Sequence, residues 1–216
     1  MKLEDINVTR YLFSPIKSIV SRPRQIVTAA LSVYASSLPG DFLETGVFTG
    51  GTSVIMARVI RRLAPEKQLF ACDSFKGLPM IQEQDKYAKG CNKCNKGFMG
   101  QFRSSRSRFE SYIRSENLDN IEIVEGFYHN TLPPNDVKEI SFLRLDGDIY
   151  NSTMTALVRL YPLVVPNGAV YIDDYGSFHG CKRAVDQYLV QNQINVTFRK
   201  VLENNGKVEA VWFLKV

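Results

Sequence analysis

The chain has 216 residues, of which 44% are hydrophobic and 23% charged, a composition that is ordinary for one soluble globular domain and excludes fibrous and wholly disordered proteins. Its 27 basic and 22 acidic residues give a formal charge of +5, and the basic excess lies mainly in residues 10–24 and 86–108. Neither patch carries a recognised nucleic-acid motif, so solvated surface is the better interpretation and nucleic-acid binding is not expected.

The sequence indicates a cytoplasmic protein that does not enter a membrane. It begins with MKLEDINVTR, which is not a signal peptide, and it contains no run of 18 apolar residues. Of the four cysteines, only Cys91 and Cys94 form a motif, and this C-x-x-C lacks the second pair of ligands that a zinc site needs. Zinc and a redox pair are therefore minor alternatives, and Cys72 and Cys181 are expected to be reduced.

Residues 1–37 are expected to form an arm followed by one packing helix. Pro15, Pro23 and scattered basic residues precede the run IVTAALSVYASSL, whose apolar positions recur at helical spacing. Such an arm can line a substrate cleft or a subunit interface. The sequence does not choose between them, so a homo-oligomer stays open.

A strand, a glycine-rich loop and a helix are predicted after Pro39. The apolar run DFLETG is followed by VFTGGTSVIMARVIRRL, in which Thr52 or Ser53 begins a helix. The loop's glycines let the backbone approach a ligand, and the amino end of the helix offers unpaired N–H groups. On its own, such a loop is a weak signal for a binding site.

The next strand ends on an acid, which strengthens that signal. The run QLFACDSF contains Asp73 about 27 residues after Gly46, a spacing typical of an acid that binds ribose hydroxyl groups. The loop is not G-x-G-x-x-G, and Glu44 is expected to place a negative charge where a pyrophosphate would lie, which disfavours a dinucleotide. S-adenosylmethionine has a ribose and a cationic centre but no phosphates, and it suits an acid-lined loop better.

Residues 76–102 are predicted to form a lid-like loop, because they are rich in Gly, Lys, Asn and Gln and have no sustained period. An amphipathic helix over residues 104–117 and the strand IEIVEG follow. The next connection contains His129, one of two histidines. For His129, and less strongly for His179, a role without ligand contact is the better interpretation.

Residues 143–175 are the most informative stretch, and they indicate two buried strands joined by a helix. Asp146 and Asp148 follow the first strand, and Asp173 and Asp174 follow the second. Ligands of open α/β sheets bind outside the carboxyl ends of the strands, so four acids delivered there are placed for chemistry. The alternative is that some of them cap helices or form ion pairs.

We expect these acids to hold a divalent cation. Mg²⁺ prefers hard oxygen ligands, and Asp146, Asp173 and Asp174 can supply them if the two strands are neighbours and the chain bends after Asp173. The repulsion among clustered carboxylates itself favours a bound cation. A metal held in this way can lower the pKa of a substrate hydroxyl group, and Asp148 is then the expected general base.

The order of the predicted elements indicates the fold. Five alternating β-α units precede the runs NVTFRKV and AVWFLKV, which an Asn-Gly turn joins as a hairpin, and Ser152 is expected to be the N-cap of the helix between the acidic strands. The fold class is therefore α/β, with a seven-stranded, mostly parallel sheet, helices on both faces and a C-terminal β-hairpin. Residues 1–216 are expected to form a single domain.

These motifs resemble the macrocin O-methyltransferase family, whose members are metal-dependent sugar O-methyltransferases that use S-adenosylmethionine. The resemblance covers roughly residues 36–190. It rests on five motifs in the family's order, which are PGDFLETGVFTGGTS, CDSFKGLP, GFYHNTLP, LRLDGDIYNSTMTALVRLYPLVVPNGAVYIDDYG and GCKRAVDQY. It implies a Rossmann-like class I methyltransferase fold and Mg²⁺-dependent methyl transfer to a hydroxyl group of a sugar or glycosylated small molecule.

The resemblance also implies roles for individual residues. The implied cofactor residues are Glu44, Thr45, Gly46 and Ser53 on the methionine and ribose side, Asp73 on the ribose hydroxyls, and Ser74 and Phe75 nearby. The implied metal ligands are Asp146, Asp173 and Asp174, with Asp148 as the base. The chain departs from the family in a short region before Pro39 and in its lysine-rich lid, so the acceptor stays open. The alternatives are a catechol-type or other small-molecule O-methyltransferase and a non-catalytic or nucleic-acid-associated protein that binds S-adenosylmethionine.

Overall fold

The helices and strands are those of a computed structural model, which describes residues 6–12, 16–86 and 99–216. The strands are β1 (Asp41–Thr45), β2 (Leu69–Asp73), β3 (Ile121–Glu125), β4 (Ile140–Leu145), β5 (Val164–Ile172), β6 (Arg199–Leu202) and β7 (Val208–Leu214). The α-helices are α1 (Arg22–Ala35), α2 (Gly51–Leu63), α3 (Arg106–Ser115), α4 (Tyr128–Thr131), α5 (Tyr150–Leu160) and α6 (His179–Gln191). Short 3₁₀ helices are η2 (Thr9–Tyr11), η3 (Glu83–Asp85) and η4 (Tyr161–Leu163). None of the helices in the described part of the chain is long and apolar enough to cross a membrane.

All seven strands belong to one sheet, in the order β3-β2-β1-β4-β5-β7-β6. Strands β1 to β5 run parallel to one another, whereas β7 pairs antiparallel with both β5 and β6. This topology confirms the predicted class, a seven-stranded and mostly parallel sheet that ends in an antiparallel hairpin. It also confirms that β4 and β5, the two strands that precede the acids, are neighbours.

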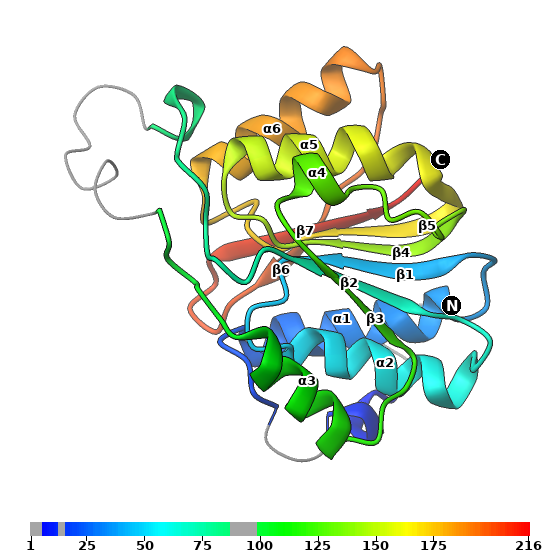
Figure 1. Ribbon diagram of the computed structural model, residues 1–216. Coiled ribbons are helices and arrows are strands. Elements are labelled where there is room, and N and C mark those ends of the chain that lie inside the picture. Colours follow the sequence, from blue (N-terminus) through cyan, green and yellow to red (C-terminus); the bar gives the residue numbers. More distant parts are fainter. Residues whose placement is uncertain (1–5, 13–15, 87–98) are drawn as a thin grey trace.

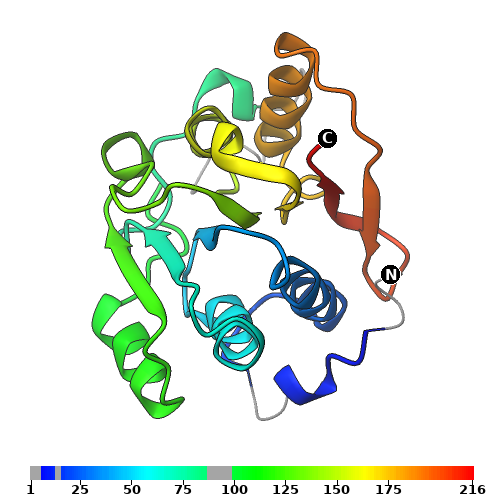
Figure 2. The ribbon, with the colours of Figure 1, turned by 90° about the vertical axis from the view of Figure 1, so that its right-hand side faces the viewer.

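Helices cover both faces of the sheet (Figure 1). Helices α1, α2 and α3 pack on one face and α4, α5 and α6 on the other, and Figure 2 shows the sheet edge-on between the two layers. Neighbouring residues of a strand point to opposite faces, so Phe42 and Phe142 belong to the core under α1 and α2, while Leu43 and Leu143 belong to the core under α5 and α6. The Phe42 and Phe142 rings meet edge to face at 5.6 Å.

The carboxyl ends of the central strands are level with one another. Thr45 is paired in register with Cys72 and with Leu145, and Leu145 is paired with Ile172. The next residue along each chain segment, which is Gly46, Asp73, Asp146 or Asp173, therefore lies at one edge of the sheet. The sequence of the strand ends thus decides which side chains meet there.

The start of α5 differs from the prediction. The helix begins at Tyr150, with Ile149 at the N-cap position, so the expectation that Ser152 caps it is wrong. The carboxylate of Asp85, which lies 65 residues earlier in the chain, accepts the N–H of Tyr150 instead. A cap supplied by a distant segment leaves no signal in the local sequence. Cys91, Cys94 and the central part of the predicted lid lie outside the described residues.

Candidate active site

A cavity of about 540 Å³ opens at the carboxyl ends of the central strands. This volume lies in the range of sites for small molecules and cofactors. The glycine loop after β1, the end of β2, the acids after β4 and β5, the segment from Ser18 to Arg24 and the segment from Gly77 to Gln82 all contribute to its wall. Residues that are far apart in the sequence therefore face one common space.

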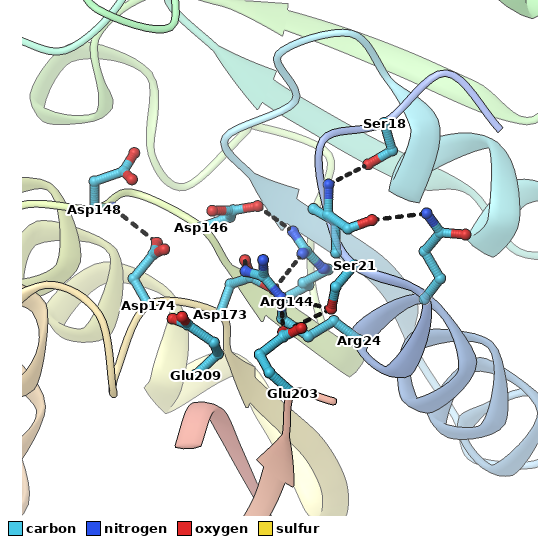
Figure 3. Close-up of polar contacts among 12 residues, drawn as sticks. Ser18, Ser21, Arg24, Arg144, Asp146, Asp148, Asp173, Asp174, Glu203 and Glu209 are labelled. Carbon is cyan, nitrogen blue, oxygen red and sulfur yellow. Dashed lines mark hydrogen bonds and ion pairs between the residues drawn. The ribbon is translucent and has the colours of Figure 1, made fainter. Parts of the chain in front are cut away.

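Three of the four predicted acids form a compact group on this wall. Carboxylate oxygens of Asp146, Asp148 and Asp174 all lie within 4.8 Å of one another. Figure 3 labels these three side chains. The N–H of Asp148 also donates to Oδ2 of Asp174 at 3.2 Å, which ties the loop after β4 to the end of β5. Oxygen atoms in this arrangement are the donor set that a hard divalent cation prefers.

Asp173 lines the same cavity, but its carboxylate is engaged by two arginines. Oδ1 accepts from Arg144 at 2.6 Å and Oδ2 accepts from Arg24 at 2.6 Å. Burial raises the pKa of Asp173 to about 6, and Asp146 adds to this shift, while the two guanidinium groups oppose it. The chain turns immediately after Ile172, which is the bend that the prediction required for Asp173 and Asp174 to reach one site.

Arg144 is the centre of a buried charge network that the sequence prediction missed. Its side chain is fully buried in β4 and donates to Asp173, to Asp146 at 2.7 Å and to Glu44 at 3.1 Å. Burial works against the charge of Arg144, but these acids outweigh it and hold the pKa of the guanidinium well above its usual value. A charged residue inside an otherwise apolar central strand was a usable signal, because such a residue has to be paired.

Arg24 is the second residue that the prediction missed. It lies in the first turn of α1 and forms ion pairs with Asp173 and, at 3.1 Å, with Glu203 at the carboxyl end of β6 (Figure 3). The Ser21 hydroxyl donates to the same Glu203 at 2.6 Å. Nothing in the basic arm distinguishes Arg24 from its neighbours, so no sequence signal could have identified it.

Of the four predicted acids, Asp146 and Asp173 pair with arginines, whereas Asp148 and Asp174 form no ion pair with an arginine in the described part of the chain. Burial raises the pKa of each carboxyl well above its ordinary value, and the neighbouring acids add to the shift. Asp148 also has a left-handed backbone, with φ at +57°, which non-glycine residues adopt rarely and which is frequent at functional sites. This uncompensated negative charge is the electrostatic feature that a bound cation would relieve.

Hydrogen bonds from its backbone hold the glycine loop against Asp73. Oδ2 of Asp73 accepts the N–H groups of Val47 and Phe48 at 2.8 and 2.9 Å, and Oδ1 accepts the N–H of Phe75 at 2.7 Å. At Gly46, which has φ at +86°, a Cβ atom would lie 1.7 Å from the backbone oxygen of Asp146. Only glycine therefore allows the loop to pass so close to the end of β4.

The predicted cofactor residues divide into two groups. Gly46, Asp73 and Ser74 line the cavity, whereas the other four are not among its described lining residues. These four are Glu44, Thr45, Ser53 and Phe75, and all of them are buried beside it.

Glu44 is fully buried and is not among the described lining residues of the cavity. Its carboxylate accepts from Ser53 and Arg144 inside the protein, and burial raises its pKa to about 7. The guanidinium of Arg144, at 3.1 Å, therefore offsets the negative charge that the sequence placed beside the loop. A pyrophosphate is disfavoured for another reason, because Asp73 already occupies the N–H groups of Val47 and Phe48.

Aromatic and apolar residues complete the wall, and the sequence prediction did not select them. His129 lines the cavity and stacks on Phe127, with 6.1 Å between the ring centroids. Ile19, Met80 and Phe102 also line it and keep 65%, 67% and 38% of their surface exposed. Part of the site thus presents apolar surface to a ligand.

Comparison with known proteins places the chain in a family. Residues 19–213 match the model of the family described as macrocin O-methyltransferase (TylF). The chain is 32% identical over 174 residues to demethyldecarbamoylnovobiocin O-methyltransferase of Streptomyces niveus, an alignment that covers 78% of this chain and 65% of the relative. It is 34% identical over 162 residues to 8-demethyl-8-(2,3-dimethoxy-alpha-L-rhamnosyl)-tetracenomycin-C 4'-O-methyltransferase of Streptomyces olivaceus, with 73% and 60% covered. The alignments therefore span less than two thirds of these curated relatives.

Solved structures agree with this placement. The O-methyltransferase NovP superposes with a TM-score of 0.80 and 27% identity, covering 92% of this chain and 82% of NovP. The calicheamicin methyltransferase CalS11 superposes with a TM-score of 0.69 over 96% of this chain and 89% of CalS11, and at 17% identity it supports the fold alone. The fold, the motif order and the family match agree, and the chain belongs to the macrocin O-methyltransferase family.

Proposed function

We propose that this protein transfers the methyl group of S-adenosylmethionine to a hydroxyl group of a sugar or a glycosylated small molecule. The observation that carries the proposal is that one cavity contains both the Gly46–Asp73 corner and the acidic group after β4 and β5. A methyl donor and an acceptor hydroxyl group would therefore lie side by side. Family membership supports this proposal, as does a relative named for a rhamnosyl-substituted tetracenomycin.

The donor would bind at the corner formed by the glycine loop and Asp73. Oδ1 of Asp73 accepts only the N–H of Phe75 and has a further lone pair, so the carboxylate can also accept from a ribose hydroxyl group. Gly46 and Ser74 would contact the donor directly. We assign Glu44, Thr45, Ser53 and Phe75 to the support of this corner, because they are buried beside the cavity. The acid-rich wall suits the cationic sulfonium of the donor.

The residues at the acidic group fit a divalent cation such as Mg²⁺. Asp146 and Asp174 belong to both the predicted ligand set and the compact group, and we propose both as ligands. For the third ligand we retain Asp173, since each of its oxygens accepts one bond from an arginine and has a further lone pair. When bound, the cation would supply Lewis-acid activation of the acceptor hydroxyl group.

Asp148 would then accept the proton of that hydroxyl group. It lines the same cavity as the proposed ligands, and its carboxylate lies within 4.8 Å of those of Asp146 and Asp174, so it is in reach of a hydroxyl group held there. Its left-handed backbone and its bond to Asp174 fix it on the cavity wall. Transfer forms a bond between the acceptor oxygen and the methyl carbon. The bond from that carbon to sulfur breaks, and its electron pair stays on the sulfur. Arg24 and Arg144 hold the neighbouring acids in place.

We retain the predicted cytoplasmic localisation as part of the proposal. Cys72 and Cys181 are both buried free thiols, which suits a reducing compartment.

Methyl transfer from radiolabelled S-adenosylmethionine to a panel of glycosides and catechols tests the proposal. We expect transfer to a glycoside with Mg²⁺ and loss of transfer with EDTA. Asp148→Asn should be about a hundredfold slower, and the exposed Asp136→Asn should be as active as the wild type. Transfer to catechols alone would contradict the sugar class. Transfer that survives EDTA would contradict the role of the metal.

A further inference from the structure

We propose that Asp85 is a positioning residue, which anchors the wall of the cavity to the loop that carries Asp148, and that Gly180 is glycine to leave room for this contact. We call the contact among Asp85, Tyr150 and Gly180 the Asp85 anchor. Its importance for catalysis rests on the proposed function, whereas its existence as a structural device does not.

Asp85 joins two segments that are 65 residues apart in the chain. Its Oδ1 atom accepts the N–H of Tyr150 at 2.6 Å, and its Oδ2 atom accepts the N–H of Gln82 at 2.8 Å. Tyr150 is the first residue of α5, where backbone N–H groups have no partner within the helix. One carboxylate therefore satisfies a helix end and closes the turn of η3 at the same time.

Gly180 provides independent support for the anchor. A Cβ atom at this position in the first turn of α6 would lie 1.8 Å from Oδ1 of Asp85 and 2.8 Å from the nitrogen of Tyr150. No side chain fits in that space, so the approach of Asp85 to Tyr150 depends on glycine here. Helix α6 and η3 are in contact, and Figure 1 shows η3 on the side of the sheet that α5 and α6 cover.

The anchor acts on the loop that contains the proposed base. Asp148 has its left-handed φ of +57° between β4 and α5, and such a conformation persists only when its surroundings hold it. Within this loop the Ile149 N–H donates to Gly147 at 2.6 Å. Two carboxylates hold the loop from outside, since Asp174 accepts the N–H of Asp148 and Asp85 accepts the N–H of Tyr150. Loss of Asp85 removes one of these two supports.

The other side of the anchor is the wall of the cavity. Leu78, Met80 and Gln82 line the cavity just before Asp85. This segment is also fixed at its start, where the Leu78 N–H donates to Gln101 and the Gly100 N–H donates to Leu78, both at 2.9 Å. The wall is thus held at both ends, and at one of them the contact reaches the Asp148 loop. A ligand that binds against residues 78–82 therefore affects the position of Asp148 through the Asp85 anchor.

Amide hydrogen exchange at Tyr150, measured by NMR in the full chain, tests the anchor without any acceptor. We expect Asp85→Ala and Gly180→Ala each to speed this exchange by about tenfold or more. The double variant should exchange no faster than the faster single variant, because both changes break the same contact. Asp85→Asn keeps an oxygen that can accept the N–H of Tyr150, so its exchange rate should lie between those of the wild type and Asp85→Ala. Glu83→Gln, a change at an exposed neighbour in η3, should have no effect.

Alanine favours helix more than glycine, so faster exchange in Gly180→Ala would not come from a weaker α6. Unchanged exchange in both single variants, or additive effects in the double variant, would overturn the anchor. With an acceptor that the wild type methylates, Asp85→Ala should lower kcat about tenfold and Asp85→Asn should recover part of it. An unchanged kcat would overturn the positioning role. If the wild type binds no S-adenosylhomocysteine, the proposed function fails while the exchange result stands.

Discussion

The guanidinium of Arg24, in the first turn of α1, lies 2.6 Å from Oδ2 of Asp173, just beyond the end of β5. The same side chain reaches Glu203, the residue directly after β6, at 3.1 Å. Asp173 receives its second cation from Arg144. The amino-terminal helix therefore supplies part of the charge balance of the site, although it lies outside the strand-and-loop motifs that identify the family.

Arg24→Ala should lower the free energy of unfolding by about 3 kcal/mol, because it leaves the buried Asp173 with one cation instead of two. Denaturant unfolding at neutral pH measures this loss. The exposed Arg62→Ala on α2 is the matched control and should cost less than about 0.5 kcal/mol. Equal effects of the two changes would show that the pair with Asp173 adds nothing to stability.

Glu44 should make stability depend on pH. Burial raises its pKa from the ordinary 4.5 to about 7, so the folded protein keeps this proton where the unfolded chain has lost it. The stability that comes from protonated Glu44 is fully present below pH 4.5 and is lost as the pH rises to about 7. Glu44→Gln has no such loss. Its free energy of unfolding relative to the wild type should therefore rise by about 3 kcal/mol across this window.

Unfolding curves of the two proteins at several pH values between 4 and 8 measure this difference. The exposed Glu139→Gln serves as the control and should run parallel to the wild type. A parallel course for Glu44→Gln would contradict the raised pKa.

Binding of Mn²⁺, followed by electron paramagnetic resonance as a substitute for Mg²⁺, should separate ligands from the base. Asp146→Asn, Asp173→Asn and Asp174→Asn should each weaken binding about tenfold or more. Asp148→Asn should keep the affinity and lose kcat by about a hundredfold. If Asp148→Asn abolished binding and Asp173→Asn preserved it, the third ligand would be Asp148, as in the compact group, and the assignment of the base would fail.

Gly46→Ala should disrupt the cofactor corner. The added Cβ atom meets the backbone of Asp146 at 1.7 Å, and φ is +86°, so the loss of stability should be about 3 kcal/mol or more. Gly206→Ala is a close control, because Gly206 has φ at +79° but open space around it, and it should cost only about 1 kcal/mol. Thermal unfolding compares the two, and equal losses would mean that backbone strain alone matters at Gly46.

The sequence predicted those features that lie within one segment. The acids at positions 146, 148, 173 and 174 stand directly after two apolar runs, so the strand ends and their shared edge follow from the pattern. The seven-stranded, mostly parallel sheet follows from the alternation of strands and helices and from the terminal hairpin.

Features that depend on two distant segments were not predictable. Arg144 lies opposite Glu44 in the register of β4 and β1, and this register brings the two buried charges together as an ion pair. Arg24 and Asp85 reach their partners, Asp173 and Tyr150, from other parts of the chain. Their roles come from packing, which a local pattern does not contain.

Calorimetric titration of S-adenosylhomocysteine into the folded protein tests the central claim most directly, because it needs no acceptor. The account predicts saturable binding at one site per chain, about tenfold weaker binding to Asp73→Asn and unchanged binding to the exposed Asp136→Asn, with no binding of NAD⁺. Folded wild-type protein that binds no S-adenosylhomocysteine, or that binds NAD⁺ more tightly, would contradict it.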